Sequence, residues 1–258
     1  MSQTWTAIRL AALRTVRDPL ALLVALAFYA VVASVISTLW RSAAHGHGGT
    51  IAGYSAGQLT WYLYVAEAAV TALNPRQIEL TGEDIATGAV SVELLRPASV
   101  VGLRIATELG RCLPRLALFS VIGGGLAWWA GGAPVRPDGL LLAVPSLLLA
   151  VVCNLAAQHA VAAAAFWIRD ARSAWFLYQK LVFVLGAMLI PVELLPGWLA
   201  ATARVLPFTS MAYAPARLAA GHVEPHLLVL QVFWAGVLLV AAAAAFAAGE
   251  RRLQVVGG

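Results

Sequence analysis

Few side chains in this sequence have types and spacings that could do chemistry, and most of them lie in one segment, residues 76–97. The charged side chains of the segment are four carboxylates and two arginines: Glu79, Glu83, Asp84, Glu93, Arg76 and Arg96. Nowhere in the chain does a nucleophile stand at a usable spacing from a base. The chemistry that the segment offers is therefore ion pairing, with Glu83, Asp84 and Glu93 available to basic groups on another protein.

The elements of this segment are predicted to be short helices. Aliphatic residues recur at roughly helical spacing, at Ile78, Ile85 and Val92. Gly82 and Gly88 are expected to break the segment into pieces, and Pro97 to end it, because the residue before a proline is disfavoured in a helix. We expect one or two amphipathic helices at a membrane face, acidic outside and aliphatic inside. The segment is longer than a simple connection requires, which indicates that a partner docks there.

Glu67 is the only carboxylate clearly inside an apolar stretch. Intramembrane carboxylates are costly and often functional, so one interpretation is a functional polar site. The other is that Glu67 lies near a cytoplasmic end and pairs with an arginine. Three further polar residues, Asn154, Gln158 and His159, lie on an alanine-rich stretch and are too scattered to suggest catalysis.

Metal and nucleotide sites are not indicated. His45 and His47 lie beside glycines, but a metal site needs three or four ligands, and a flexible hydrophilic loop is expected there. The three glycines at 123–125 are followed by no GK[ST] and indicate close helix packing. Cys112 and Cys153 show no metal-binding spacing and are expected to be buried thiols. We expect no metal and no cofactor in this chain.

Composition identifies the chain as a membrane protein. It is 61% hydrophobic and 11% charged over 258 residues, whereas about a quarter of the residues in a soluble domain are charged. Six stretches, one interrupted by Lys180, approach or exceed the ~20 residues that cross a bilayer. They are residues 19–40, 42–66, 116–135, 139–168, 173–191 and 226–249. The predicted fold is an all-α membrane protein with six transmembrane helices in a single domain, 1–258.

Basic residues predict the orientation. With both termini in the cytoplasm, thirteen of the seventeen lysines and arginines lie at or near the cytoplasmic face, as the positive-inside rule requires. The arginines are spread over separate loops, so the positive charge does not indicate nucleic-acid binding. The excess of arginine over lysine, with abundant alanine and glycine, suggests a GC-rich bacterial genome.

Two further segments are predicted to lie at the membrane surface. Residues 2–18 are expected to form an interfacial helix with Arg9, Arg14 and Arg17 toward the headgroups, or else a frayed basic tail. Residues 191–225 are too apolar for a solvated loop and are punctuated by prolines, so we expect an external re-entrant helical hairpin before the sixth span.

Two motifs resemble segments of the ABC type-2 exporter permeases. EDIATGAVSVELLRPAS, residues 83–99, is similar to an I-x-x-G segment followed by L-L-x-P in that family. PVELLPGWLAATARVLPF, residues 191–208, is similar to the external hairpin of that family. The likeness covers essentially the whole chain, especially the branch in which paired permeases share one ATPase. Glu67 and Lys180 are not residues of the family pattern.

The resemblance implies a permease subunit of an ATP-driven exporter in the bacterial inner membrane. ATP and Mg²⁺ would bind to a cytoplasmic ABC ATPase dimer, this chain would not be an enzyme by itself, and it would pair with a second copy or with a paralogous permease. The implied coupling residues are Glu83, Asp84, Ile85, Gly88, Val92, Glu93, Leu94, Leu95, Arg96 and Pro97, with Ile85, Val90, Val92 and Leu94 filling a cleft of the ATPase. The implied external gate residues are Pro191, Glu193, Pro196, Trp198, Pro207 and Phe208.

An apolar bundle favours a hydrophobic or amphipathic substrate. Two other classes of function stay open from the sequence. A membrane-embedded lipid-modifying enzyme would require polar residues clustered within one leaflet, and a secondary transporter would require paired half-repeats with broken, charged spans.

Overall fold

The computed structural model describes residues 3–46, 48–94, 99–168 and 171–256, and within them the fold is helical except for one small β-hairpin. The all-α membrane class is therefore confirmed. The elements are α1 (Gln3–Val16), α2 (Pro19–Gly46), β1 (Thr50–Ile51), β2 (Tyr54–Ser55), α3 (Ala56–Thr71), α4 (Gln77–Ala86), α5 (Val90–Leu94), α6 (Val100–Gly131), α7 (Pro137–Ala162), η1 (Ala163–Phe166), α8 (Ala171–Leu185), η2 (Val192–Leu194), α9 (Gly197–Val205), η3 (Pro207–Ser210), α10 (Tyr213–Ala219) and α11 (His226–Val256).

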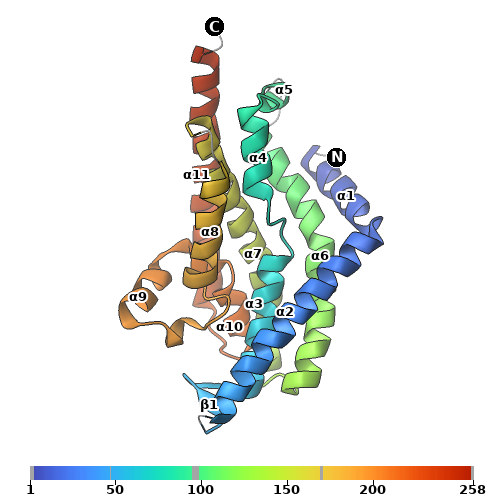
Figure 1. The fold of residues 1–258 in the computed structure, drawn as a ribbon, viewed down its shortest axis with the longest axis vertical. Coiled ribbons are helices and arrows are strands. Elements are labelled where there is room, and N and C mark those ends of the chain that lie inside the picture. Colours follow the sequence, from blue (N-terminus) through green and yellow to red (C-terminus); the bar gives the residue numbers. More distant parts are fainter. Residues whose placement is uncertain (1–2, 47, 95–98, 169–170, 257–258) are drawn as a thin grey trace.

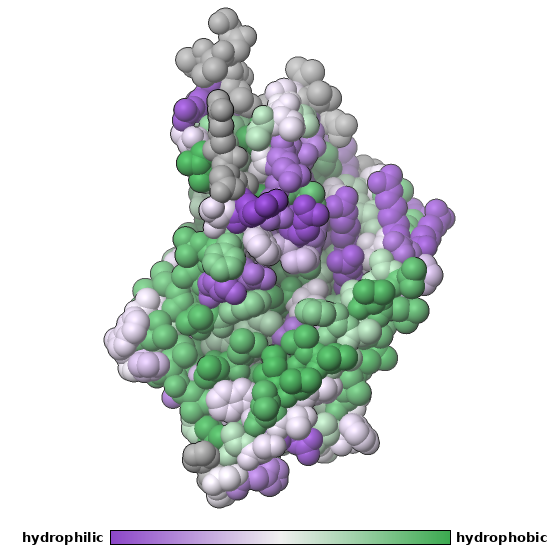
Figure 2. Space-filling model, in the orientation of Figure 1, coloured by the Kyte–Doolittle hydropathy of each residue, from purple (hydrophilic) through white to green (hydrophobic). Residues whose placement is uncertain are grey.

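The helices form an elongated bundle with two different ends (Figure 1). At one end, here the α4 end, α4, α5, α1 and the last turns of α11 project together. At the other, the hairpin end, lie β1 and β2, with α9 and α10 nearby. Figure 2 shows an apolar surface over the middle and lower part of the bundle and polar residues above it, at the α4 end. Both described ends of the chain lie at the α4 end.

Among the described residues, four helices are long and apolar enough to cross a membrane: Pro19–Gly46, Val100–Gly131, Pro137–Phe166 and His226–Arg252. The second and fifth predicted spans correspond to shorter helices, since α3 has 16 residues and α8 has 15. The stretch 42–66 is not one helix. The positive φ angles of Gly48, Gly49 and Gly53 allow the chain to turn through the hairpin before α3 begins. A charge-free run therefore overestimated the length of this helix.

Close contact between α2, α3 and α6 depends on a glycine. A Cβ atom at Gly123 would lie 1.8 Å from the Tyr29 hydroxyl oxygen. The Tyr29 ring stacks on Phe119 of α6 at 4.7 Å between centroids, and its hydroxyl donates to the Tyr64 carbonyl oxygen of α3 at 3.0 Å. The glycine triplet thus contributes to close packing, as the sequence predicted, and Gly123 is the member in contact.

A glutamine holds α7 to α11. Gln231, which is fully buried, accepts a hydrogen bond from the Ser146 hydroxyl at 2.8 Å. Its amide nitrogen donates to the carbonyl oxygens of Ser146 and Ser210. Because buried polar groups are costly unless they are hydrogen-bonded, these contacts specify how α11 packs on α7 and η3. Both cysteines are free and buried.

The first helix lies along α6. Gly110 brings the two backbones together, because a Cβ atom there would lie 2.3 Å from the Ile8 carbonyl oxygen. The chain then turns at Asp18, whose carboxylate accepts the backbone N–H of Ala21 at 3.1 Å and so caps the start of α2.

Candidate functional site

A groove of about 970 Å³ runs between α2 and α8, with α3 behind it. Figure 1 shows α2 and α8 on the same side of the bundle. The residues of α2 that line the groove extend from Leu20 to Ile36, and Asp18 lies at its start. The rise of an α-helix is 1.5 Å per residue, so the groove follows α2 for about 24 Å. This length covers most of the ~30 Å thickness of the hydrocarbon core of a bilayer.

The wall of the groove is mostly apolar, and besides Asp18, Asn74, Arg115 and Gln179 it contains one polar cluster. The cluster consists of Glu67 and Thr71 of α3, Asn154 and Gln158 of α7, and Tyr178 of α8. The Asn154 side-chain oxygen accepts hydrogen bonds from the Tyr178 hydroxyl at 2.6 Å and from the Gln158 amide at 3.0 Å. The Thr71 hydroxyl donates to Glu67 at 2.7 Å. The fold thus brings together polar residues that are distant in the sequence.

The surroundings of Glu67 bear on one of its two interpretations, the pairing with an arginine. Its side chain is buried, and no ion pair joins it to an arginine within the described part of the chain. Glu67 does lie near the end of α3, but its observed partner is Thr71, one turn further along the helix, and not an arginine. The cluster offers amide, phenol and carboxyl groups as hydrogen-bonding partners to a molecule in the groove.

The hairpin end of the groove is held closed by the loop after α8. The Trp40 indole N–H of α2 donates to the Leu189 carbonyl oxygen at 3.0 Å. The Tyr62 hydroxyl of α3 donates to the Ala187 carbonyl oxygen, and Ala187 has a positive φ of 53°. Met188 and Leu189 of this loop line the end of the groove.

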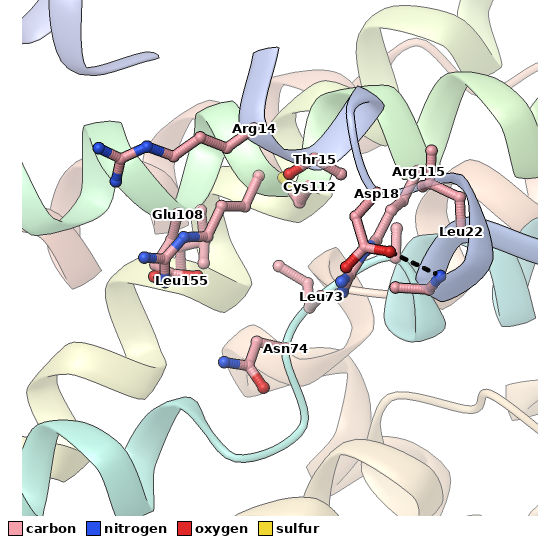
Figure 3. Close-up of a pocket in the computed structure, with 13 residues that line it drawn as sticks. Arg14, Thr15, Asp18, Leu22, Leu73, Asn74, Glu108, Cys112, Arg115 and Leu155 are labelled. Carbon is pink, nitrogen blue, oxygen red and sulfur yellow. Dashed lines mark hydrogen bonds and ion pairs between the residues drawn. The ribbon is translucent and has the colours of Figure 1, made fainter. Parts of the chain in front are cut away.

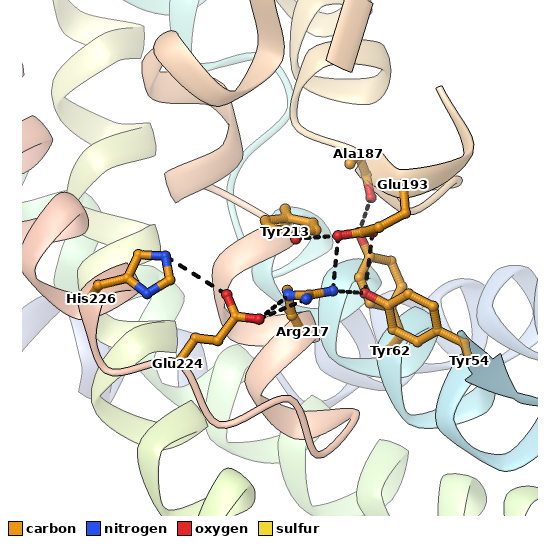
Figure 4. A network of polar contacts seen from close by, with 8 residues as sticks. All are labelled: Tyr54, Tyr62, Ala187, Glu193, Tyr213, Arg217, Glu224 and His226. Carbon is orange, nitrogen blue, oxygen red and sulfur yellow. Dashed lines mark hydrogen bonds and ion pairs between the residues drawn. The ribbon is translucent and has the colours of Figure 1, made fainter. Parts of the chain in front are cut away.

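Beyond that loop lies a polar network around Arg217 of α10 (Figure 4). Its guanidinium group contacts Glu193 at 2.8 Å and Glu224 at 2.6 Å. It also donates to the hydroxyl of Tyr54 in the β-hairpin at 2.6 Å, and the hydroxyl of Tyr213 donates to Glu193 at 2.6 Å. The network joins the β-hairpin, η2, α10 and the loop before α11.

The network perturbs two titratable groups in the loop that follows α10. Burial alone would raise the pKa of Glu224, but the hydrogen bonds and the charge of Arg217 outweigh it and hold that pKa below its ordinary value. Burial, assisted by the charge of Arg217, lowers the pKa of His222. Both lowered pKa values favour the deprotonated forms, so at neutral pH Glu224 is charged and His222 is neutral.

Of the gate residues, Glu193 alone is part of this network. Pro191 and Pro196 precede η2 and α9, and Pro207 opens η3. Trp198 is 73% exposed on α9, and the Phe208 ring lies 6.4 Å from that of Tyr178. Sequence reasoning missed Arg217, Glu224 and Tyr54. A charged residue within an otherwise apolar segment was the available signal for Arg217, but nothing in the sequence linked it to Tyr54.

At the α4 end, Arg104 of α6 makes a second two-carboxylate centre. Its guanidinium group contacts Asp84 of α4 at 2.8 Å and Glu93 of α5 at 2.7 Å. The sequence predicted that these two acids would meet a partner protein, whereas the structure pairs them within the chain. Arg111 contacts Glu108 at 2.6 Å, and Arg104 is engaged elsewhere.

The coupling residues do not share one surface. Glu83 is exposed and has no ion pair within the described residues, but Ile85 and Val90 are buried in the core of the chain itself and so cannot fill a cleft of another protein. Gly88 has a φ of +77° and ends α4, whereas Gly82 lies buried inside α4 and does not break it. The backbone positions of Val92 and Leu94 fall in α5, and Leu95, Arg96 and Pro97 lie outside the described residues.

Within the part of the chain that the structure describes, no three metal-ligating side chains come together. His45 lies in the last turn of α2, where its ring nitrogen Nδ1 is 2.6 Å from the Arg41 carbonyl oxygen. A helix therefore occupies part of the region where a flexible loop was expected. His47 lies outside the described residues.

A family model described as an ABC-2 family transporter protein matches residues 21–257. No curated protein sequence matches the chain.

Proposed function

This chain belongs to the ABC-2 family of transporter proteins, and on that premise we propose that it is the permease subunit of an ATP-driven exporter. ATP is hydrolysed on a separate cytoplasmic ATPase dimer, and the chain itself carries the substrate path in the plasma membrane of a bacterium. Both termini are cytoplasmic, so the α4 end faces the cytosol and the hairpin end faces outward. Six spans result if α3 and α8 cross together with their flanking segments.

The observation that carries this proposal is the groove between α2 and α8. Its length along α2 covers most of the hydrocarbon thickness, and its wall is mostly apolar, with the cluster around Glu67 and Asn154 among its polar residues. A hydrophobic or amphipathic substrate with a hydrogen-bonding group fits such a wall. In the working transporter the groove is completed by a second copy of the chain or by a paralogous permease.

The cluster also meets one requirement of a lipid-modifying enzyme, namely polar residues at one level of the membrane. Its members are hydrogen-bonded in two groups, Glu67 with Thr71 and Asn154 with Tyr178 and Gln158. The Thr71 hydroxyl donates to the Glu67 carboxylate, but within the described residues no third group orients that carboxylate as a base, so substrate recognition accounts for the cluster better than catalysis does.

The ATPase docks on the exposed side of α4 and α5. Glu83 of α4, Thr87 just after that helix and Ala89 before α5 are exposed there, while Ile85 and Val90 anchor the two helices in the bundle. Because these helices are anchored in the core, a sideways movement of α4 and α5 displaces α6, α7 and α8 as rigid elements. The exposed acid is available to a basic residue of the ATPase.

Transport through the groove is tested by filling it. Val32 lines the groove, whereas Val31 is 62% exposed on α2 and does not line it. We expect Val32→Trp to reduce ATP-dependent uptake of a fluorescent amphipathic dye into inside-out vesicles by about tenfold or more, because the added ring obstructs the path. The chain is co-expressed with its ATPase, and co-purification of the ATPase confirms that the complex remains assembled.

Val31→Trp is the matched control and should leave uptake nearly unchanged. Equal uptake by the two variants would contradict transport through this groove.

Docking is tested separately with Glu83→Arg, which should reduce co-purification of the ATPase in detergent. Asp138→Arg makes the same charge change at the hairpin end and should not. ATP hydrolysis by the purified chain alone would overturn the assignment as a subunit without its own ATPase.

A further inference from the structure

A second cavity, of about 380 Å³, lies at the α4 end where α1 turns into α2. Arg14, Thr15 and Asp18 line it from this turn, and Glu108, Arg111 and Arg115 line it from α6. In Figure 3, Arg14, Asp18, Glu108 and Arg115 surround the space. We call it the elbow pocket. Its residues have no part in the groove closure or in the ATPase docking described above.

The elbow pocket carries positive charge that is not neutralised. Three arginines face two carboxylates, and both carboxylates are already engaged. Asp18 caps α2 through the Ala21 N–H, and Glu108 binds Arg111. No ion pair of the described residues includes Arg14 or Arg115. The site is therefore suited to an anion.

One guanidinium nitrogen lacks an acceptor. The Nε atom of Arg115 is shielded from solvent and has no hydrogen-bond partner in the structure. Buried polar atoms are nearly always hydrogen-bonded, and guanidinium groups bind phosphate through two parallel hydrogen bonds. A phosphate oxygen in the elbow pocket would supply the missing acceptor.

The surroundings indicate that the phosphate belongs to a lipid. Helix α1 exposes Trp5, Leu10 and Val16 at 54%, 51% and 57%, so this helix has an apolar surface for the acyl region beside its arginines. Immediately after the turn, Leu20 of α2 is 71% exposed. The elbow pocket thus lies where an interfacial helix becomes a membrane span, which is the level of the headgroups.

The elbow pocket also joins the groove. Five residues line both spaces: Asp18, Ala21, Leu73, Asn74 and Arg115. We propose that the elbow pocket binds the phosphate of an anionic phospholipid, with Arg115 and Arg14 as its ligands and the acyl chains along the exposed apolar face of α2. This inference does not depend on the transport function.

The test measures lipid binding to the purified full chain. Phosphatidylglycerol and phosphatidylcholine are titrated in detergent, and the bound lipid is counted by native mass spectrometry. We expect the chain to prefer phosphatidylglycerol, and Arg115→Gln to weaken its binding by about tenfold, because hydrogen bonds to charged groups are the strong ones. Arg14→Gln should weaken it less, since that side chain is exposed, and provides a variant whose folding is not in question.

Arg17→Gln is the matched control, because Arg17 is also exposed next to the turn but does not line the elbow pocket. It should retain the preference for phosphatidylglycerol. Equal losses in Arg17→Gln and in the two pocket variants would overturn the site in favour of general surface charge. Inorganic phosphate at millimolar concentration and constant ionic strength should not displace the lipid, and displacement would overturn the assignment to a lipid headgroup.

Discussion

Each end of the molecule has an arginine that binds two carboxylates, but the surroundings of the two arginines differ. At each end one largely buried arginine holds two carboxylates from different segments. Arg104 binds Asp84 and Glu93 at the α4 end, and Arg217 binds Glu193 and Glu224 at the hairpin end. The arginine side chains are similarly buried, at 12% and 15% exposed.

The difference lies in their partners. The side chains of Asp84 and Glu93 are 46% and 37% exposed, whereas those of Glu193 and Glu224 are 20% and 30% exposed. Two tyrosines complete the Arg217 centre, whereas within the described residues Arg104 is held by the two acids, Asp84 and Glu93. Exposed ion pairs contribute little and exchange easily, whereas breaking a buried pair is costly. The comparison indicates that the α4 end, where the ATPase is proposed to dock, can rearrange. The hairpin end is locked by its ion pairs.

The largest effect is expected from Arg217→Gln. The change leaves two partly buried carboxylates close together without their cation, so we expect a loss of about 2–3 kcal/mol in the free energy of unfolding. Thermal unfolding in detergent, followed by tryptophan fluorescence, measures it. Arg204→Gln is the control, because Arg204 is exposed on α9 in the same region. If both variants unfolded alike, the hairpin end would not be locked by Arg217.

A smaller loss of stability is expected from Arg104→Gln, about 1 kcal/mol, because water screens the more exposed acids. Its effect on coupling should be larger, since α5 is no longer held to α6. The ATPase activity of the assembled complex should stop responding to substrate. Arg136→Gln removes an exposed pair with Asp138 and should change neither property. A larger loss of stability than that of Arg217→Gln would reverse the comparison.

The closure of the groove can be weakened by one hydrogen bond. Trp40→Phe keeps an aromatic ring but removes the donor to Leu189, which should cost about 1 kcal/mol or less. A cysteine introduced at Met188 should then react faster with a membrane-impermeant maleimide added from outside. The same cysteine in a chain that keeps Trp40 gives the reference rate, and equal rates would show that this bond does not keep the hairpin end closed.

The smallest effect is expected from pH. His222 has an ordinary pKa of 6.5 that the fold lowers, so the unfolded chain binds more protons below about that pH, and the stability that His222 contributes is lost as the pH falls. The lowered pKa of Glu224 acts in the same direction, below its ordinary value of 4.5. Melting temperature should fall by a few degrees from pH 7.5 to 5.5, and His222→Gln should flatten the change. An unchanged slope in that variant would exclude His222 as its source.

Local patterns in the sequence were sufficient for part of the site. The helical spacing of Ile78 and Ile85 predicted an amphipathic helix with an aliphatic inner face, and α4 buries both residues. The same pattern did not reveal that Ile85 belongs to the core of this chain and not to an interface. Burial by another protein and burial by one's own helices leave the same apolar signature.

The sequence by itself determined the membrane class, because apolar residues in such excess need lipid whatever the fold, and the motifs at residues 83–99 and 191–208 indicated the family. Only the tertiary structure decided which charges meet. Arg217 and Tyr54 are 163 residues apart, and Asp84 of α4 meets Arg104 of α6 although α5 lies between these helices in the sequence. Hydrogen bonds and ion pairs act over a few ångströms in space, so their partners are set by helix packing and not by distance along the chain.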